Sequence, residues 1–292
     1  MEKKTTNIEK KEDNLIIGRH CLMKNPDYLP GAVKEASSYE ANALMIYLGA
    51  PQNSFRQPLN VLKVSEFKQS LKENNIDINH VIVHGSYLIN LANTIKQEVF
   101  NFSLELLEKE IKRMEEIGLK TLILHPGSHL TATKEEGLAQ ITRGLNLILA
   151  KNSAIRIALE TMSGKGKELG ITFEQLKFII DKINFKEKVG VCWDTCHLYS
   201  AGYDLKNNLE QVIEEFDQII GLDKLWVIHI NDSLQELGAK KDRHENIGYG
   251  RIGLPALKKI VHHPKLRGVI KLLETPRNRE FYREEIKILK EN

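Results

Sequence analysis

Short apolar runs alternate with longer amphipathic segments along almost the whole chain. The runs are rich in Val, Ile and Leu and have the near-continuous hydrophobicity of parallel strands buried on both faces. Eight are present: NLIIG (14–18), NALMIYLG (42–49), HVIVHG, TLILHPG, RIALET, VGVCWDTCH, LWVIHIND and VIKLLET. The segments between them show helical spacing, as in 103–117, where apolar residues share one face and Gly118 occupies the C-cap position. Eight strand–helix units of about 36 residues predict an α/β fold, a single (β/α)₈ TIM barrel.

Local signals set the limits of the domain. Thr133 and Thr172 each precede a Glu or Gln by three residues, the capping-box spacing of a helix start. No GxGxxG follows the first apolar run and no linker interrupts the chain, which disfavours a dinucleotide-binding sheet and a second domain. The opening MEKKTTNIEKKED is charged and lacks the apolar core of a secretory signal. We therefore expect a disordered tail at 1–13 and a barrel domain at 14–292.

Six of the apolar runs lead directly into side chains that can bind a metal. Residues that follow successive parallel strands of a barrel meet at one mouth, where such enzymes keep their chemistry. Burying several ionisable groups together costs several kcal/mol each unless they are paired or bound to cations. With a further pair in the loop after the seventh run, the candidates are His84, His125, Glu160, Asp194, His197, His229, Asp242, His244 and Glu274. Imidazoles and carboxylates in this number suit two or three ions of zinc, manganese or iron.

Taken singly, each candidate has a plainer explanation. One His at the end of an apolar strand is more often a structural residue satisfied by backbone hydrogen bonds. Asp242 and His244 alone would fit a turn-stabilising Asp beside a surface His. The repeated placement at strand ends is what favours the metal site. The segment SGKGKELG (163–170) lacks the GxxxxGK[ST] order of a phosphate-binding P-loop, so that function is disfavoured.

Composition excludes several classes without choosing one. Hydrophobic residues make up 41% and charged residues 28%, which is typical of a globular protein. A formal net charge of +3 permits a polyanionic partner without demanding one, so any nucleic-acid surface would be local. Cys21, Cys192 and Cys196 show no CxxC spacing, which indicates reduced, buried thiols and a cytoplasmic protein. No apolar stretch approaches the ~18 residues of a membrane span, so we expect no membrane association.

Several motifs together are specific to one family. They are HGSY (84–87), HPGSH (125–129), WDTCH (193–197), AGYD (201–204), HINDS (229–233), DRH (242–244) and LLET (272–275). With them, over residues 14–290, the chain resembles endonuclease IV, the metal-dependent apurinic/apyrimidinic endonuclease family of DNA base-excision repair. The resemblance implies double-stranded DNA as partner and cleavage of the phosphodiester 5′ to an abasic site, leaving a 3′-hydroxyl and a 5′-deoxyribose phosphate. It also implies removal of blocking groups from 3′ ends.

The resemblance further implies a trinuclear zinc site, with manganese as an alternative occupant of one position. The first ion would be held by His84, His125 and Glu160, the second by Glu160, Asp194, His229 and Glu274, and the third by His197, Asp242 and His244. Glu160 would bridge the first two ions and is one of two expected catalytic residues. Glu274 is the other, and we expect it to orient the attacking hydroxide or accept its proton.

DNA contacts are expected near the same mouth. Tyr87 resembles the family's side chain that enters the minor groove at the lesion, and APQNSFRQP (50–58) stands where the family has a DNA-penetrating segment. Some members carry Arg directly after the residue that matches Gln52. Here Asn53 stands at that position, and Arg56 is close enough in sequence to substitute. The expected DNA-binding residues are Tyr87, Gln52, Asn53, Arg56 and Arg243.

Two other functions stay open at this point. Sugar isomerases and epimerases with similar barrels bind one or two divalent ions through strand-end Glu, Asp and His. They would not need the trio His197, Asp242 and His244. A protein that binds damaged DNA without cleaving it would be expected to have lost ligands, and none is missing. We expect a monomer, because a barrel that grips bent duplex can work alone.

Overall fold

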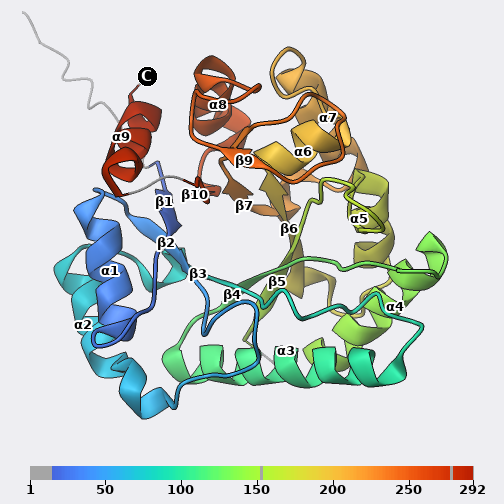
Figure 1. Ribbon diagram of the computed structural model, residues 1–292, viewed down its shortest axis with the longest axis horizontal. Coiled ribbons are helices and arrows are strands. Elements are labelled where there is room, and N and C mark those ends of the chain that lie inside the picture. Colours follow the sequence, from blue (N-terminus) through green and yellow to red (C-terminus); the bar gives the residue numbers. More distant parts are fainter. Residues whose placement is uncertain (1–14, 152–153, 277–278, 292) are drawn as a thin grey trace, which may run out of the picture.

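The eight apolar runs form the wall of a closed barrel. The computed structural model describes residues 15–151, 154–276 and 279–291, so the tail expected at 1–13 lies outside the described residues. The barrel strands are β1 (Ile17–His20), β2 (Ala43–Ile46), β3 (Val81–His84), β4 (Thr121–Leu124), β5 (Arg156–Glu160), β6 (Val189–Asp194), β7 (Leu225–His229) and β10 (Ile270–Leu273). They close in the order β1-β10-β7-β6-β5-β4-β3-β2 with every neighbouring pair parallel (Figure 1). The expectation of a TIM barrel is confirmed.

Helices surround the barrel and connect its strands (Figure 1). They are α1 (Tyr28–Ser38), α2 (Val64–Glu73), α3 (Gln97–Ile117), α4 (Lys134–Leu149), α5 (Phe173–Asp181), α6 (Thr195–Ala201), α7 (Leu209–Ile219), α8 (Leu254–His262) and α9 (Arg279–Lys290). Short 3₁₀ helices are η1 (Leu59–Leu62), η2 (Ile78–His80), η3 (Lys186–Lys188), η4 (Leu222–Lys224) and η5 (Pro264–Leu266). A two-stranded antiparallel hairpin, β8 (Asp232–Ser233) with β9 (His244–Glu245), follows β7. No helix in the described part of the chain combines the length and the apolar composition that a membrane crossing requires.

The helix ends carry the signals expected from the sequence, with one difference. Gly118 ends α3 in a left-handed conformation, φ +96°, which favours glycine. Thr133 and Glu136 form a complete capping box at the start of α4. Thr172 accepts a hydrogen bond from the Gln175 backbone N–H, so it caps α5. The Gln175 side chain does not complete the box, because it accepts from two backbone N–H groups of the preceding loop instead.

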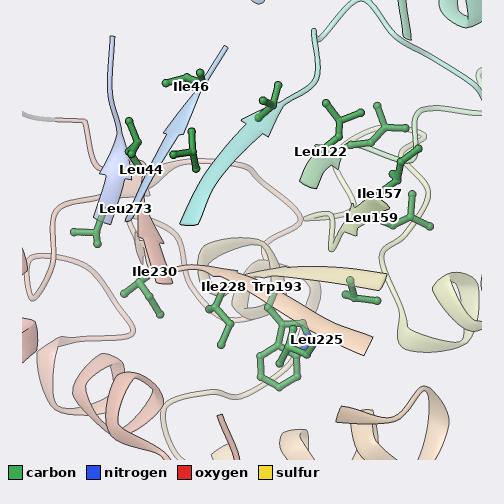
Figure 2. Close-up of a cluster of buried hydrophobic side chains, with 14 of the residues drawn as sticks. Leu44, Ile46, Leu122, Ile157, Leu159, Trp193, Leu225, Ile228, Ile230 and Leu273 are labelled. Carbon is green, nitrogen blue, oxygen red and sulfur yellow. The ribbon is translucent and has the colours of Figure 1, made fainter. Parts of the chain in front are cut away.

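Apolar side chains pack on both sides of the barrel wall, because successive residues of a strand point to opposite faces. Leu44 and Ile46 of β2 face outward and belong to the large cluster shared with the helices (Figure 2). Their neighbours Ala43 and Met45 face inward. The inner cluster is Ala43, Met45, Ile82, Ile123, Ala158, Cys192, Val227, Ile270 and Leu272. This cluster fills the interior of the barrel, so the side chains at the strand ends lie directly above a packed apolar layer.

Candidate metal centre

The strand-end residues singled out in the sequence all lie at the carboxyl-terminal mouth of the barrel. They are His84 on β3, His125 after β4, Glu160 on β5, Asp194 on β6, His229 on β7 and Glu274 after β10. Strand register shows which way they point. Asp194 pairs with His229, and two residues earlier Cys192 pairs with Val227 of the inner core. Since alternate residues of a strand share a face, the ligand candidates form the top layer of the barrel interior.

Glu160 connects two groups of ligands. Its Oε2 atom lies 3.1 Å from Nε2 of His84 and 3.1 Å from Nε2 of His125. Its other oxygen, Oε1, lies 3.2 Å from Nδ1 of His229. The Glu160 side chain is only 1% exposed, so both oxygens serve partners inside the protein. A carboxylate that faces one ligand group with each oxygen is arranged as a bridge between two metal ions.

The second group lies on the far side of Glu160. Nδ1 of His229 is 3.1 Å from Oε2 of Glu274 and 3.8 Å from Oδ2 of Asp194. One ligand atom from each of the four residues lies within 4.8 Å of the other three. Four donors at this separation can share one ion.

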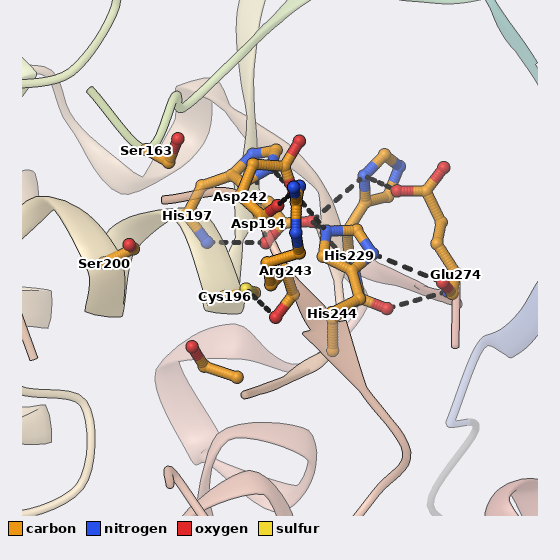
Figure 3. Close-up of polar contacts among 12 residues, drawn as sticks. Ser163, Asp194, Cys196, His197, Ser200, His229, Asp242, Arg243, His244 and Glu274 are labelled. Carbon is orange, nitrogen blue, oxygen red and sulfur yellow. Dashed lines mark hydrogen bonds and ion pairs between the residues drawn. The ribbon is translucent and has the colours of Figure 1, made fainter. Parts of the chain in front are cut away.

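The third group joins α6 to the β8–β9 hairpin. Asp194 is the N-cap of α6 and accepts the backbone N–H of His197 at 2.8 Å, which aims both side chains at the mouth. Asp242 Oδ1 lies 3.3 Å from Nε2 of His197 and 3.5 Å from Nε2 of His244 (Figure 3). Asp194 Oδ2 is 3.4 Å from the same His244 nitrogen. The trio His197, Asp242 and His244 is therefore brought together, and Asp194 lies between it and the second group.

Hydrogen bonds behind the imidazoles fix their orientation. In His84, His197 and His244 the Nδ1 atom contacts a backbone carbonyl oxygen, at 2.8, 2.9 and 3.2 Å respectively. An Nδ1–H that donates to a carbonyl leaves the Nε2 lone pair free for a metal ion. Nε2 of His197 and of His244 is buried, and the groups nearest to it are the Asp242 and Asp194 carboxylates, 3.3–3.5 Å away. Buried imidazole nitrogens that face carboxylates fit bound cations, and this donor set is one that zinc and manganese accept.

Asn231 positions two of the carboxylates. Its Nδ2 donates to Asp194 Oδ2 at 2.7 Å, and its Oδ1 accepts the backbone N–H of Glu274 at 2.8 Å. The Asn231 backbone N–H in turn donates to Thr195 Oγ1 at 2.8 Å. All of these groups are buried or nearly so. One amide side chain thus ties together two carboxylates of the second group, and one of them, Asp194, also faces His244 of the third group.

The ionisable groups of the centre shift one another's pKa values. Burial alone would raise the pKa of Glu160, but His229 and a second imidazole lower it well below its usual range. Burial also opposes charge on His197, yet Asp194 raises the pKa of that imidazole well above its ordinary value. The hydrogen bond from His197 lowers the pKa of Asp242 to about 2. These carboxylates are anionic at neutral pH, and a cation that binds here competes with protons on the imidazoles.

Four of the five residues expected to contact DNA are accessible at the mouth. Tyr87 is 52% exposed, its hydroxyl hydrogen-bonds with that of Tyr47 at 2.8 Å, and its ring stacks on His125. Gln52 and Asn53 are exposed in the loop after β2. Arg243 is exposed on the hairpin beside the third ligand group.

Arg56 is placed differently from the expectation. Its guanidinium is buried, with its side chain 1% exposed, and forms an ion pair with Glu110 of α3. It also donates to the carbonyl oxygens of Asn53 and Phe55, at 2.9 and 2.7 Å. Arg56 therefore holds its loop to the protein and does not present its charge to DNA. The loop instead exposes Phe55, which is 64% accessible.

The strand-end rule extends to two residues that the sequence analysis overlooked. His20 ends β1 and Tyr47 directly follows β2. The His20 ring meets Tyr47 edge-on at 5.1 Å, and Tyr47 lies 4.9 Å from the His84 ring. The sequence carries the signal, because His20 comes shortly after the apolar run 14–18 and Tyr47 lies near the end of the run 42–49. All eight strands therefore contribute a polar or aromatic side chain to the mouth.

Fold and centre together define a class of protein: a TIM barrel whose mouth holds three adjoining ligand groups, the architecture of a multi-metal hydrolase. A family model described as xylose isomerase-like TIM barrel matches residues 33–292. The chain is similar to a probable endonuclease 4 of Geobacillus kaustophilus, with 49% identity over 262 residues that cover 90% of this chain and 87% of the relative. It belongs to the endonuclease IV family.

Solved structures agree with this assignment. Endonuclease IV from Thermus thermophilus superposes with a TM-score of 0.82 at 27% identity, covering 94% of this chain and 97% of that one. A D-tagatose 3-epimerase-like protein gives a TM-score of 0.69 at 19% identity, covering 94% and 96%, a likeness of fold alone. The family membership confirms the resemblance seen in the sequence. It also confirms the expectation of an enzyme, a metal-dependent nuclease of DNA repair.

Proposed function

We propose that the protein hydrolyses the phosphodiester 5′ to abasic sites in double-stranded DNA, leaving a 3′-hydroxyl and a 5′-deoxyribose phosphate, and clears blocking groups from 3′ ends. The observation that carries the proposal is the contact of three ligand groups at one mouth, joined through Glu160 and Asp194. A phosphodiester in hydrolysis develops charge on several oxygens at once, and adjoining cations neutralise it. An isomerase needs only one or two metal ions, so it would have no use for the third group of ligands.

We assign three zinc ions to these groups, with manganese as the alternative at one of them. His84, His125 and Glu160 would hold the first ion, and Glu160, Asp194, His229 and Glu274 the second. His197, Asp242 and His244 would hold the third, with Asp194 within reach. When bound, such ions would lower the pKa of a coordinated water to about 7 and would neutralise charge on phosphate oxygens.

Glu274 and Glu160 take different roles because their accessibility differs. The Glu274 side chain is 15% exposed, whereas that of Glu160 is 1% exposed. Glu274 can therefore meet water and substrate, and we assign it the orientation of the attacking water and acceptance of its proton. Burial would raise the pKa of Glu274, but His229 lowers it well below its usual range, so the carboxylate is anionic at neutral pH. Glu160, enclosed between two ligand groups, acts by holding the geometry.

DNA binding in this proposal rests on accessible side chains around the mouth. Tyr87 projects next to His125 and is the side chain that we expect to enter the duplex at the lesion. Gln52, Asn53 and Phe55 line the exposed loop, and Arg243 adds positive charge on the opposite hairpin. Arg56 contributes to DNA binding only indirectly, because it holds that loop against the protein. We keep a monomer and a cytoplasmic location as predictions, which size-exclusion chromatography with light scattering and cell fractionation would test.

Incision of a defined duplex tests the proposal. The substrate is a 5′-labelled duplex with one tetrahydrofuran abasic analogue, and the control is the same duplex without the analogue. We expect a single cut 5′ to the analogue, with a product that a polymerase extends from its 3′-hydroxyl. Glu274→Gln should bind this duplex as the unmodified protein does while turnover falls by orders of magnitude. Intact DNA together with epimerisation of a ketohexose by the metal-loaded protein would refute the nuclease and support the isomerase.

A further inference from the structure

A buried carboxylate on the C-terminal helix lies beside the metal centre without being part of it. Glu285 of α9 is 4% exposed and is outside the three ligand groups found among the described residues. Burying a carboxylate costs free energy unless hydrogen bonds or cations compensate it. Where α9 only packs against the barrel it uses apolar side chains, such as Ile286 and Leu289, which are both 0% exposed. Packing alone therefore does not account for Glu285.

Each oxygen of Glu285 contacts a different segment of the mouth. Oε2 accepts the hydroxyl of Thr275 at 2.6 Å. Oε1 accepts Nδ2 of Asn246 at 2.6 Å and the backbone N–H of Ile247 at 3.0 Å. Thr275 and Asn246 are 4% and 0% exposed, so solvent does not compete for these hydrogen bonds. Three donors thus satisfy both oxygens and compensate the buried charge.

The two segments carry ligands of the second and third groups. Thr275 directly follows Glu274, and Asn246 comes two residues after His244. The carbonyl oxygen of Glu274 also lies 3.2 Å from Nδ1 of His244, so the two segments meet at the mouth (Figure 3). A displacement of either segment would therefore move a ligand. The carboxylate of Glu285 opposes such a displacement, because it holds both segments at once.

The helix α9 provides a fixed point because other contacts hold it in place. Its apolar face is part of the large hydrophobic cluster outside the barrel wall. The carbonyl oxygen of Leu289 accepts a hydrogen bond from Nε2 of His262 on α8 at 2.8 Å. Nε of Arg283 donates to the carbonyl oxygen of Ser38 at 2.9 Å. Loss of the Glu285 carboxylate should thus release the two mouth segments and leave the helix docked.

We propose that Glu285 is a positioning residue of the metal centre: its carboxylate ties the segment of Glu274 to the segment of His244 and holds both against α9. This inference rests on the metal binding of the proposed function. Loss of a partner behind metal ligands typically lowers metal affinity or activity about 10- to 100-fold. Glu285 acts through the backbone next to the ligands, so we expect the lower end of that range, about 10-fold.

Hydrogen exchange in the metal-free protein separates positioning from mere anchoring of the helix. Glu285→Ala removes all three hydrogen bonds, Glu285→Gln can keep them, and Glu284→Ala changes an exposed neighbour on the same helix as the control.

Two backbone amides that do not touch Glu285 report on the mouth: that of Glu274, which donates to Asn231, and that of Leu234, which donates to Arg243 across the hairpin. We expect Glu285→Ala to make both exchange severalfold faster while the amides of α9 are unchanged, and Glu285→Gln to restore most of the protection. Equal acceleration in α9 and in the mouth, or a pattern like that of the control, would overturn the inference.

Zinc release from the loaded proteins is the second test, followed with a chromogenic chelator. Glu285→Ala should lose the ions of the second and third groups ~10-fold faster than the unmodified protein, while the ion of the first group leaves at the unmodified rate. Glu285→Gln should recover most of the difference and Glu284→Ala should show none. Unchanged release in Glu285→Ala, or equal acceleration of every ion, would overturn the inference. An unmodified protein that takes up no zinc but shows the expected exchange pattern would refute the metal assignment and still support the positioning of the two segments.

Discussion

The buried pair Arg56–Glu110 makes a sharp prediction about DNA binding. Glu110 lies on α3 and is 1% exposed, and Arg56 connects it to the carbonyl oxygens of Asn53 and Phe55. Glu110→Gln removes the counter-charge of a buried guanidinium, which keeps only its hydrogen bonds to neutral carbonyl oxygens. Breaking a buried pair in this way costs about 3–5 kcal/mol. Because Arg56 sits in a loop, the chain can avoid much of that cost by releasing the loop from α3.

A released loop must be ordered again when DNA binds. Ordering the loop again uses part of the free energy of DNA binding. If that part is about one to three kcal/mol, the affinity for DNA falls about 5- to 150-fold, at 1.4 kcal/mol per factor of ten. Fluorescence anisotropy with a duplex that carries an abasic analogue measures the dissociation constant, and metal analysis checks the centre. The matched control is Glu108→Gln on the same helix, whose carboxylate pairs with Lys112 and Lys151 in solvent. Unchanged affinity of Glu110→Gln, or equal losses in both variants, would refute the role of Arg56 as a brace.

Three further predictions concern separate parts of the molecule. Asp242→Asn should lower the zinc content by one ion per chain and slow incision, since Asp242 is within 3.5 Å of both imidazoles of the third group; full zinc content by atomic absorption would contradict this. Tyr87→Ala should weaken binding to the abasic duplex more than to undamaged duplex, as compared by anisotropy at one salt concentration. Lys271 is 1% exposed, and burial lowers its pKa from 10.5 to about 8. Below pH 8 the folded state therefore carries a buried positive charge, which destabilises it. This destabilisation is lost as the pH rises towards 10.5, the pKa of Lys271 in the unfolded state. Lys271→Met should therefore raise the free energy of unfolding at pH 7 by about 2–3 kcal/mol, less the lost hydrogen bond to Leu266, and the gain should shrink by about pH 10 in urea titrations.

The barrel and the ligand positions were predictable from the chain because both depend on local pattern. Each strand is a short apolar run, and the residue that ends it must lie at the mouth once the strands are parallel. The same rule covers His20, which ends β1, and Tyr47, which directly follows β2. The capping signals were equally local, and Thr133 behaves as its spacing predicts.

Features that depend on contacts between distant segments could not be predicted from local sequence patterns. Arg56 and Glu110 are 54 residues apart, and nothing in either segment signals that they meet in the interior. Arg56 was expected on DNA because it lies three residues after Asn53, in the loop that resembles the family's DNA-penetrating segment. Asn231 likewise gives no sign in the sequence that it joins Asp194 to the backbone of Glu274. The side-chain rotation that turns Nδ1 of His229 towards Glu160 and Glu274 is likewise not specified by the order of residues.

Anomalous scattering at the zinc edge from crystals of the purified protein tests the central claim most directly. The account predicts three zinc peaks at the mouth, with Glu160 between the first and second and with Asp242 and His244 on the third. A single peak, or a site that leaves Asp242 and His244 without an ion while the protein still cuts abasic DNA, would contradict it.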